Sequence, residues 1–263
     1  MNLLFESPSW IFSSVLVVVP SILLCLTALW LVRKNVSTET LRKNHDVAGF
    51  TFSIIGVLYS VILGFTVINV QERYNNARET IHKEAMVLAD LYRDADFFPP
   101  DSRDAIRLDL KDYVNYVLKE EWSLHQEKMI RFKAQKILAR IWNDYYQVDI
   151  GNERSKIWYE QSIAKLDDLM NVRLAREFST WEHLGSMMWS LLILGALITT
   201  CFMFFFGLEN HRMQMLMTSL LAGYLSFMLY LVFSLDHVFQ GPERIKPVAL
   251  EQVLLLFKQW DAS

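Results

Sequence analysis

The sequence predicts an all-α membrane protein with four transmembrane helices and a helical extramembrane domain inserted between the second and the third. Four long stretches contain no Asp, Glu, Lys or Arg, although 21% of the 263 residues are charged. Each reaches the roughly 20 apolar residues that a helix needs to cross a ~30 Å hydrocarbon layer. The charged segment between the second and third stretches repeats its apolar residues every three or four positions, which indicates amphipathic helices, and no segment alternates as a strand does.

The first two spans are a simple anchor and the start of a much longer helix. Span 11–32 follows a segment without Lys or Arg and has no small-residue cleavage pattern, so we expect a retained anchor instead of a cleaved signal peptide. Span 47–70 continues without Gly or Pro into an apolar stripe, which predicts one helix running far beyond the bilayer. The stripe consists of Tyr74, Ala77, Ile81, Ala85, Leu88, Leu91 and Ala95.

A pair of prolines is expected to end this long helix. The residue before a proline is driven out of helical geometry, so the helix should end before Pro99 and Pro100. Asp101 or Ser102 is then expected to cap the next helix, near 102–121.

The rest of the charged segment is also expected to be helical. A helix is predicted near 125–146, ended by Gly151-Asn152. A second stripe follows, with only Gly185 between it and the third span, so we expect that span also to continue from a helix outside the bilayer. This stripe consists of Tyr159, Ile163, Leu166, Met170, Leu174, Phe178 and Trp181.

The last two spans, 184–208 and 213–235, are expected to be joined by a tight turn at 209–212. Gly195 and Gly223 should allow close helix contacts. After them, a helix of about 13 residues with one apolar face is too short to cross the bilayer. We expect it to dock on the helical block instead of lying on the membrane surface. Its apolar face consists of Leu250, Val253, Leu254, Phe257 and Trp260.

These elements predict four segments along the chain. They are the first two transmembrane helices (1–70), a helical cytoplasmic domain (71–183), the third and fourth transmembrane helices (184–235) and a C-terminal docking segment (236–263).

No residue pattern predicts catalysis or a bound cofactor. The sequence lacks HExxH, GxxxxGK[ST], GxGxxG and GxSxG motifs and has no cysteine pair at metal-ligand spacing. Its most suggestive pair, Glu121 and His125, is more typical of a surface contact than of a metal site. We therefore expect no enzyme activity, no cofactor and no metal site. The net charge of −3 also argues against nucleic-acid binding.

The second span carries two neighbouring faces. At ~100° per residue, a face of small residues would let another helix approach closely. It consists of Gly49, Ser53, Gly56, Ser60 and Gly64. About a quarter turn away lies an apolar stripe of Phe50, Ile54, Val57, Val61, Phe65 and Ile68.

Continued along the same helix, the apolar stripe meets Glu72, Asn75 and Glu79. A pore helix with a hydrophobic constriction and a charged mouth has this pattern. An ordinary amphipathic extension of a core helix has it too, and periodicity alone does not separate the two interpretations.

Four motifs carry a resemblance to a known family. They are GFTFSIIGVLYSVILGFTV from Gly49, Glu-Arg-Tyr at 72–74, Glu121-Trp122, and LDHVFQGPERIKP from Leu235. Together they resemble the bacterial bestrophin-like proteins of unassigned function, which are similar to the bestrophin channels. The resemblance covers roughly residues 47–260.

The resemblance implies a pentameric ion channel whose second membrane helix lines an apolar neck around a Leu-Gly-Phe segment, matched here by Leu63-Gly64-Phe65. It places Val57 and Val61 in the neck with Phe65, and the stripe adds Ile68. Calcium-gated bestrophins carry consecutive acidic residues after the fourth helix. Here only Asp236 and Glu243 are acidic between 235 and 247, so calcium gating is not expected.

Three functions fit these observations. The first is a homo-oligomeric, pentameric ion channel with its pore lined by the second span. The second is a stator-type energy-coupling subunit that borrows an acidic helix from a partner, with Thr199, Thr200 and Thr218 as its polar lining. The third is a non-conducting scaffold or sensor.

The expected partners are copies of the same chain, the lipid bilayer and a permeant ion. Glu72 and Glu79 at the mouth favour a cation, although Arg73 and Arg78 are neighbours. More Lys and Arg flank the spans on the side of the large block than on the other side, which favours a cytoplasmic block. The positive loop after the first span argues the other way, and the resemblance decides for a multi-pass protein of the bacterial inner membrane.

Overall fold

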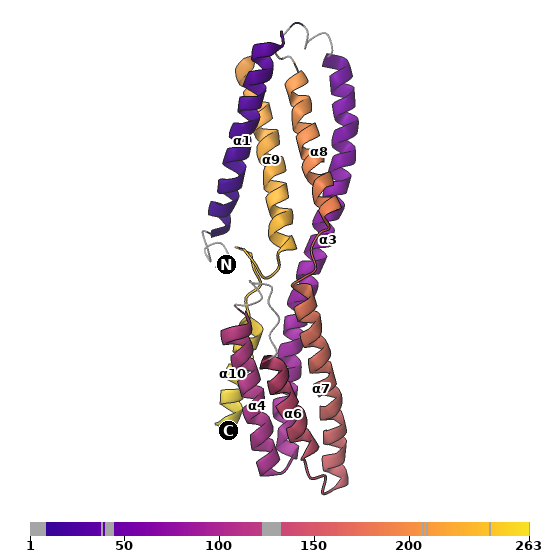
Figure 1. The fold of residues 1–263 in the computed structure, drawn as a ribbon, viewed down its shortest axis with the longest axis vertical. Coiled ribbons are helices and arrows are strands. Elements are labelled where there is room, and N and C mark those ends of the chain that lie inside the picture. The colour runs from indigo at the N-terminus through magenta and orange to yellow at the C-terminus, as the bar shows by residue number, and fades with distance from the viewer. Residues whose placement is uncertain are drawn as a thin grey trace. The chain divides into compact units, whose positions relative to one another are not determined.

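The chain is almost entirely helical in the computed structural model, which confirms the predicted fold class (Figure 1). No strand occurs in the part of the chain that the structure describes, which is residues 9–37, 39, 45–122, 133–206, 208, 210–241 and 243–262. In chain order the elements are α1 (Ser9–Asn35), α3 (His45–Asp94), the short 3-10 helix η1 (Ala95–Phe97), α4 (Pro100–Tyr116), the π-helix η2 (Val117–Glu121), α6 (Lys133–Tyr146), α7 (Glu153–Ser179), α8 (Ser186–Phe205), α9 (His211–Asp236) and α10 (Val248–Asp261).

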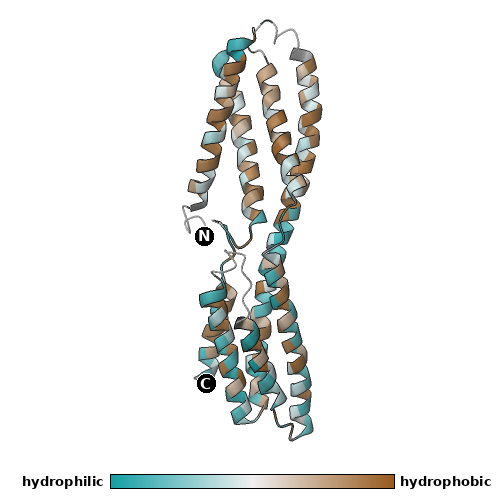
Figure 2. Cartoon of the chain, in the orientation of Figure 1, coloured by the Kyte–Doolittle hydropathy of each residue, from teal (hydrophilic) through white to brown (hydrophobic). Residues whose placement is uncertain are grey.

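Among the described residues, four helices are long and apolar enough to cross a membrane, and each coincides with one of the predicted spans. They lie at Trp10–Asn35, Val47–Phe97, Ser186–Phe205 and His211–Asp236. Figure 2 shows the contrast along α3, which is apolar in its first half and mixed in character in its second half. The long helix predicted from the uninterrupted sequence after the second span is confirmed, because α3 runs without a break for 50 residues.

The chain divides into two units, and each is described by itself. The membrane unit comprises Met1–Glu72, His183–His237 and Gly241–Glu243. The helical unit comprises Arg73–Glu182, Val238–Gln240 and Arg244–Ser263.

In the membrane unit, α9 packs against both α1 and α8, and α3 reaches α8 through Tyr59. The Tyr59 hydroxyl donates a hydrogen bond to the Leu192 carbonyl at 3.0 Å. A Cβ atom added at Gly195 would lie 2.3 Å from the Tyr59 ring, so only glycine fits there. The close helix contact predicted at Gly195 is therefore confirmed.

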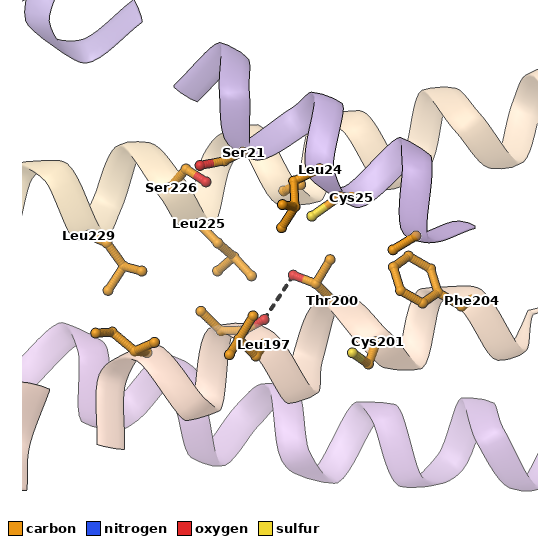
Figure 3. A pocket seen from close by; sticks show the side chains of 14 residues that line it. Ser21, Leu24, Cys25, Leu197, Thr200, Cys201, Phe204, Leu225, Ser226 and Leu229 are labelled. Carbon is orange, nitrogen blue, oxygen red and sulfur yellow. Dashed lines mark hydrogen bonds between the residues drawn. The ribbon is translucent and has the colours of Figure 1, made fainter. Parts of the chain in front are cut away.

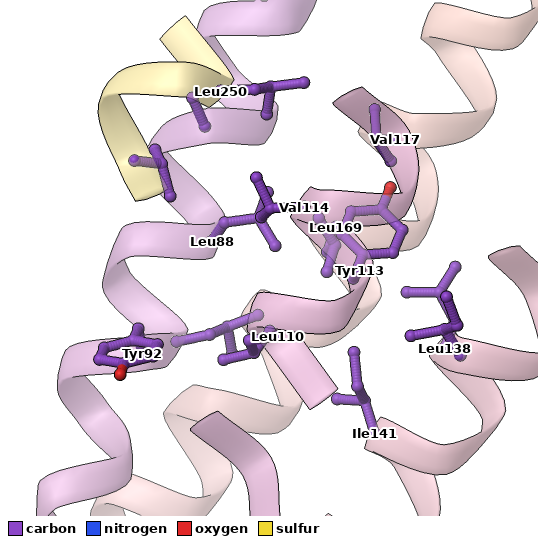
Figure 4. Packing of buried hydrophobic residues seen from close by; sticks show 14 of the residues in the cluster. Leu88, Tyr92, Leu110, Tyr113, Val114, Val117, Leu138, Ile141, Leu169 and Leu250 are labelled. Atoms are coloured by element: carbon purple, nitrogen blue, oxygen red, sulfur yellow. The ribbon is translucent and has the colours of Figure 1, made fainter. Parts of the chain in front are cut away.

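In the helical unit, apolar side chains from α3, α4, α6, α7 and α10 meet in one core (Figure 4). Leu88 of α3, Leu110 of α4 and Leu250 of α10 are fully buried in it. Helix α10 packs through Phe257, whose ring stacks on Tyr92 with 3.9 Å between ring centroids. The apolar face of the tail helix is thus covered by its own chain.

A network of charged side chains lies inside the same unit. Arg176 of α7 is fully buried and donates to both oxygens of Glu84 of α3, at 2.6 and 3.2 Å. It also donates to Glu121 of η2 at 2.7 Å. Arg173 donates to the other oxygen of Glu121 at 2.9 Å, and the Tyr113 hydroxyl of α4 donates to Glu84 at 2.6 Å. These groups connect four elements through charge-assisted hydrogen bonds.

Burial and neighbouring charges both shift the pKa values of Arg176 and Tyr113 in this network. Burial alone would lower the pKa of Arg176, but the charges of Glu84 and Glu121 outweigh it and raise the pKa well above its ordinary value. Burial, followed by the charge of Glu84, raises the pKa of Tyr113 well above its ordinary range. The arginine therefore stays charged and the tyrosine stays a hydrogen-bond donor.

The network explains why the apolar stripe along α7 is exposed over its second half. Met170, Leu174, Phe178 and Trp181 are 38–55% exposed. The buried face lies about a quarter turn away at ~100° per residue. It consists of Ser162, Leu166, Leu169, Arg173, Arg176 and Thr180. The two arginines face inward because their carboxylate partners do.

Two local expectations are wrong. Helix α4 begins at Pro100 after Pro99, with no side-chain cap from Asp101 or Ser102, because proline suits the first helical turn, where no amide hydrogen is needed. The third span does not continue from α7, because turn and irregular backbone separates Ser179 from Ser186. The predicted helix start near 125 and turn residue 209 lie outside the described residues.

We expect Arg176→Met to lower the free energy of unfolding by about 3–5 kcal/mol, because it leaves two buried carboxylates without their cation. The measurement is thermal unfolding of the purified protein in detergent, followed by circular dichroism. The matched control is Arg140→Met, which removes a half-exposed arginine paired with Asp109 and Asp112. Its cost should stay within about 1 kcal/mol. Equal losses in the two variants would contradict a structural role for the buried network.

Candidate functional site

The predicted pore stripe lies on the side of α3 that its own chain leaves uncovered. In the membrane unit, α3 buries Tyr59, Leu63, Thr66 and Val70. The four predicted neck residues lie about half a turn away from this buried face at ~100° per residue. Their exposed fractions are 63% for Val57, 50% for Val61, 69% for Phe65 and 64% for Ile68. These apolar side chains are available to lipid or to another chain.

The predicted small-residue face is also uncovered over most of its length. A Cβ atom added at Gly56 or Gly64 would meet no described atom within 4 Å, whereas one at Gly49 would lie 3.7 Å from Phe206. The hydroxyls of Ser53 and Ser60 donate to carbonyls of their own helix, at 2.9 and 2.8 Å. The face thus carries only small side chains, and its hydroxyls are hydrogen-bonded within α3. A helix from another chain could approach it closely.

The three predicted mouth residues, Glu72, Asn75 and Glu79, are exposed. Glu79 pairs with Lys83 one turn further along α3, with 2.8 Å between the charged atoms. The hydrogen bond from Lys83 lowers the pKa of Glu79, so this carboxylate is ionised at neutral pH. Part of its negative charge is balanced locally by Lys83.

A pocket of about 220 Å³ lies elsewhere in the membrane unit, among α1, α8 and α9 (Figure 3). Most of its lining is apolar, and it contains both cysteines, Cys25 and Cys201, which are free. The Thr200 hydroxyl at its wall donates to the Ala196 carbonyl at 2.8 Å. Because α3 contributes no residue to this pocket, it is separate from the predicted neck.

The polar residues of the last two spans mostly satisfy their own helices. The Thr199 hydroxyl donates to the Gly195 carbonyl at 2.7 Å, and that of Ser219 donates to Met215 at 2.8 Å. Thr218 is fully buried, and its hydroxyl has no hydrogen-bond partner among the described residues. Apart from Thr218, these hydroxyls therefore have a hydrogen-bond acceptor within their own helix.

Sequence reasoning missed two features. One is the exposure of Met170, Leu174 and Phe178 on α7 and of Trp181 just after it, which periodicity alone does not reveal. The other is a cluster of His183, Asp236 and His237, whose members come from distant parts of the chain. Of the pair considered in the sequence, Glu121 belongs to the buried network of α7, and His125 lies outside the described residues.

The comparisons with known proteins agree on one family. A sequence profile of the Bestrophin-like domain matches residues 19–250. The chain is similar in structure to a point mutant of a bacterial bestrophin homologue from Klebsiella pneumoniae, with 16% identity, a TM-score of 0.71, and 92% of this chain and 98% of the other covered. None of the curated proteins compared with the chain matches it.

Two further crystal structures of the Klebsiella pneumoniae bestrophin homologue give the same result. A second point mutant has 14% identity and a TM-score of 0.71, with 95% of this chain and 100% of the other covered. The structure phased with zinc has 17% identity and a TM-score of 0.67, with 93% and 98% covered. At these identities the likeness establishes a shared fold. The sequence profile spans most of the chain, and this membrane protein therefore belongs to the bestrophin-like family.

Proposed function

We propose that this chain forms a homo-oligomeric, pentameric ion channel whose pore is lined by α3. The observation that carries the proposal is the apolar stripe of α3, which lies opposite the face that packs on the chain itself. In a ring of copies, one such stripe from each subunit would surround the axis. The similarity to a bacterial bestrophin homologue supports a channel of this kind.

In this proposal Val57, Val61, Phe65 and Ile68 form the neck. Apolar side chains around a narrow passage oppose its filling by water and so limit ion flow. The small-residue face of Gly49, Ser53, Gly56, Ser60 and Gly64 then receives the neighbouring subunit's helix at close range. Remaining apolar surface of the four spans contacts lipid.

The mouth of the pore is assigned to Glu72, Asn75 and Glu79. A ring of carboxylates attracts cations and repels anions, so we propose a preference for cations. The ion pair between Glu79 and Lys83 reduces the negative charge at that position. Glu72 is accordingly expected to contribute more to selectivity than Glu79.

The exposed stripe on α7 supports self-association. Met170, Leu174, Phe178 and Trp181 lie in the helical unit, in a segment rich in charged residues that is not expected to enter the bilayer. An exposed apolar stripe of this kind typically marks a contact with another protein. A closed ring of identical chains would cover it with a neighbouring copy.

We further propose that the protein lies in the bacterial inner membrane, with residues 71–183 as a cytoplasmic domain and 236–263 as its docking segment. The excess of Lys and Arg on that side of the spans supports this orientation.

The neck can be tested in liposomes that contain the purified protein. We expect Val57→Ala and Phe65→Ala each to raise ion flux by about twofold or more, because a wider apolar neck is easier to hydrate. The matched control is Leu220→Ala on α9, which removes an equally exposed apolar side chain from a different helix. It should leave flux unchanged.

Absence of flux from the unmodified protein would favour a non-conducting scaffold. A larger effect of Leu220→Ala than of the two α3 variants would indicate that α9, not α3, lines the passage.

The mouth can be tested by reversal potentials in planar bilayers with a salt gradient. We expect Glu72→Gln to lower the ratio of cation to anion permeability, because it removes a carboxylate from each subunit. Glu79→Gln should have a smaller effect. Glu251→Gln on α10 removes an exposed carboxylate far along the sequence and serves as control. Equal ratios in all four proteins would rule out a charge filter at the mouth.

The role of α7 can be tested by the size of the assembly. We expect Leu174→Glu to lower the subunit number measured by native mass spectrometry, because it introduces charge into the exposed apolar stripe. Ala175→Glu adds the same charge to an exposed neighbour outside the stripe and should leave the assembly intact. An unchanged assembly in Leu174→Glu would show that the stripe is not a subunit contact.

A further inference from the structure

Two histidines and an aspartate meet where the third span begins and the fourth span ends. His183 lies in the segment before α8, Asp236 is the last residue of α9, and His237 follows it. Each offers one candidate ligand atom, and these atoms all lie within 4.8 Å of one another. The two imidazole rings are stacked, with 4.8 Å between their centroids. All three residues belong to the membrane unit.

Hydrogen bonds orient both imidazole rings. Nδ1 of His183 lies 3.0 Å from the Asp236 carbonyl oxygen, and Nδ1 of His237 lies 3.0 Å from that of Phe233. A carbonyl oxygen only accepts hydrogen bonds, so both Nδ1 atoms must carry the proton. In the neutral rings, Nε2 then holds a lone pair. Histidines that bind metals typically donate their second nitrogen to a carbonyl or carboxylate in this way.

The lone pair on His183 is buried. Its Nε2 atom is inaccessible to solvent and has no hydrogen-bond partner among the described residues. A buried polar atom without a partner costs about 1–3 kcal/mol. A metal ion bound at Nε2 would remove this cost and leave the hydrogen bond at Nδ1 intact.

The carboxylate is buried and oriented as well. Asp236 is 2% exposed. Its Oδ1 accepts from the Leu184 amide at 2.8 Å, and its Oδ2 accepts from the Trp189 indole at 3.4 Å. Both donors are neutral, so the carboxylate keeps the negative charge that attracts a cation. They would hold the carboxylate in place as the outer shell of a metal site does.

We propose that His183, Asp236 and His237 bind a divalent transition-metal ion, for which Zn²⁺ is the best match. Two imidazoles and one carboxylate are ordinary zinc ligands, and a water molecule would complete a tetrahedron. Calcium and magnesium prefer sites made of oxygen atoms. With metal–ligand bonds of ~2.0–2.2 Å, the ligand atoms of such a site lie about 3.3 Å apart. Side chains whose ligand atoms lie within 4.8 Å of one another would move closer together when they bind the ion.

The bound ion would connect the start of α8 with the end of α9. This assignment departs from the sequence-based expectation of no metal site, and it does not depend on whether the protein conducts ions.

The test uses the full-length protein in detergent, purified without a histidine tag and stripped with a chelator. Zinc binding is measured by competition with a chromophoric chelator. We expect one Zn²⁺ per chain, and Co²⁺ in its place should give the strong visible absorption of a tetrahedral site. His237→Ala and Asp236→Asn should each raise the dissociation constant for Zn²⁺ by at least about tenfold. Asparagine retains an oxygen that can accept from the Leu184 amide.

The matched control is His211→Ala, which removes an exposed histidine at the other end of α9. It should bind Zn²⁺ as the unmodified protein does. Circular dichroism and gel filtration identify any variant that fails to fold, and His237→Ala decides the result if Asp236→Asn does so. Unchanged affinity in a folded His237→Ala, an equal loss in His211→Ala, or no stoichiometric binding by the unmodified protein would each overturn the proposal.

Discussion

The helical unit depends on a buried arginine, Arg176, and the carboxylates around it. Arg176 lies at the centre of four elements, with Glu84 of α3 on one side and Glu121 of η2 on the other. A guanidinium is stable in such an interior only when carboxylates surround it, and those carboxylates are in turn costly to bury without it. This mutual requirement sets the rotation of α7 about its own axis. An apolar stripe that would otherwise form core is therefore turned to the surface.

The rotation of α7 leaves an apolar surface exposed that the proposed assembly of several chains would use. In the membrane unit, α3 uses Tyr59 and its neighbours to contact α8, and its opposite side stays apolar and uncovered. In the helical unit, α7 likewise exposes the stripe that includes Leu174 and Phe178. Both surfaces are apolar, and neither is covered by the chain itself. The proposed ring of identical subunits would cover both surfaces, with the α3 stripe at the axis and the α7 stripe between neighbours.

Polar side chains gather where the spans end. His183, Asp236 and His237 meet there, and the Asp236 carboxylate holds the Leu184 amide just before α8 begins. Within the spans, by contrast, most hydroxyls bond to their own helix, as Thr199 does with Gly195. This separation follows from the solvent, because hydrocarbon offers no hydrogen bonds and a polar group there must find its partner locally. At the ends of the spans, side chains from different helices can share a ligand instead.

The sequence by itself determined the four spans, the unbroken helix α3, the apolar tail helix and the close contact at Gly195, because hydropathy, helix continuity and the absence of a side chain are local properties. It also identified which residues of α3 share a stripe, since helical periodicity is fixed by the backbone. Periodicity does not say which stripe is covered. Only the tertiary structure decided that Val57 and Phe65 are exposed, that α7 turns Arg173 and Arg176 inward, and that His183 meets His237. These three results depend on residues that are distant in the chain. A charged residue is expected to face solvent unless a buried residue of opposite charge is known to pair with it.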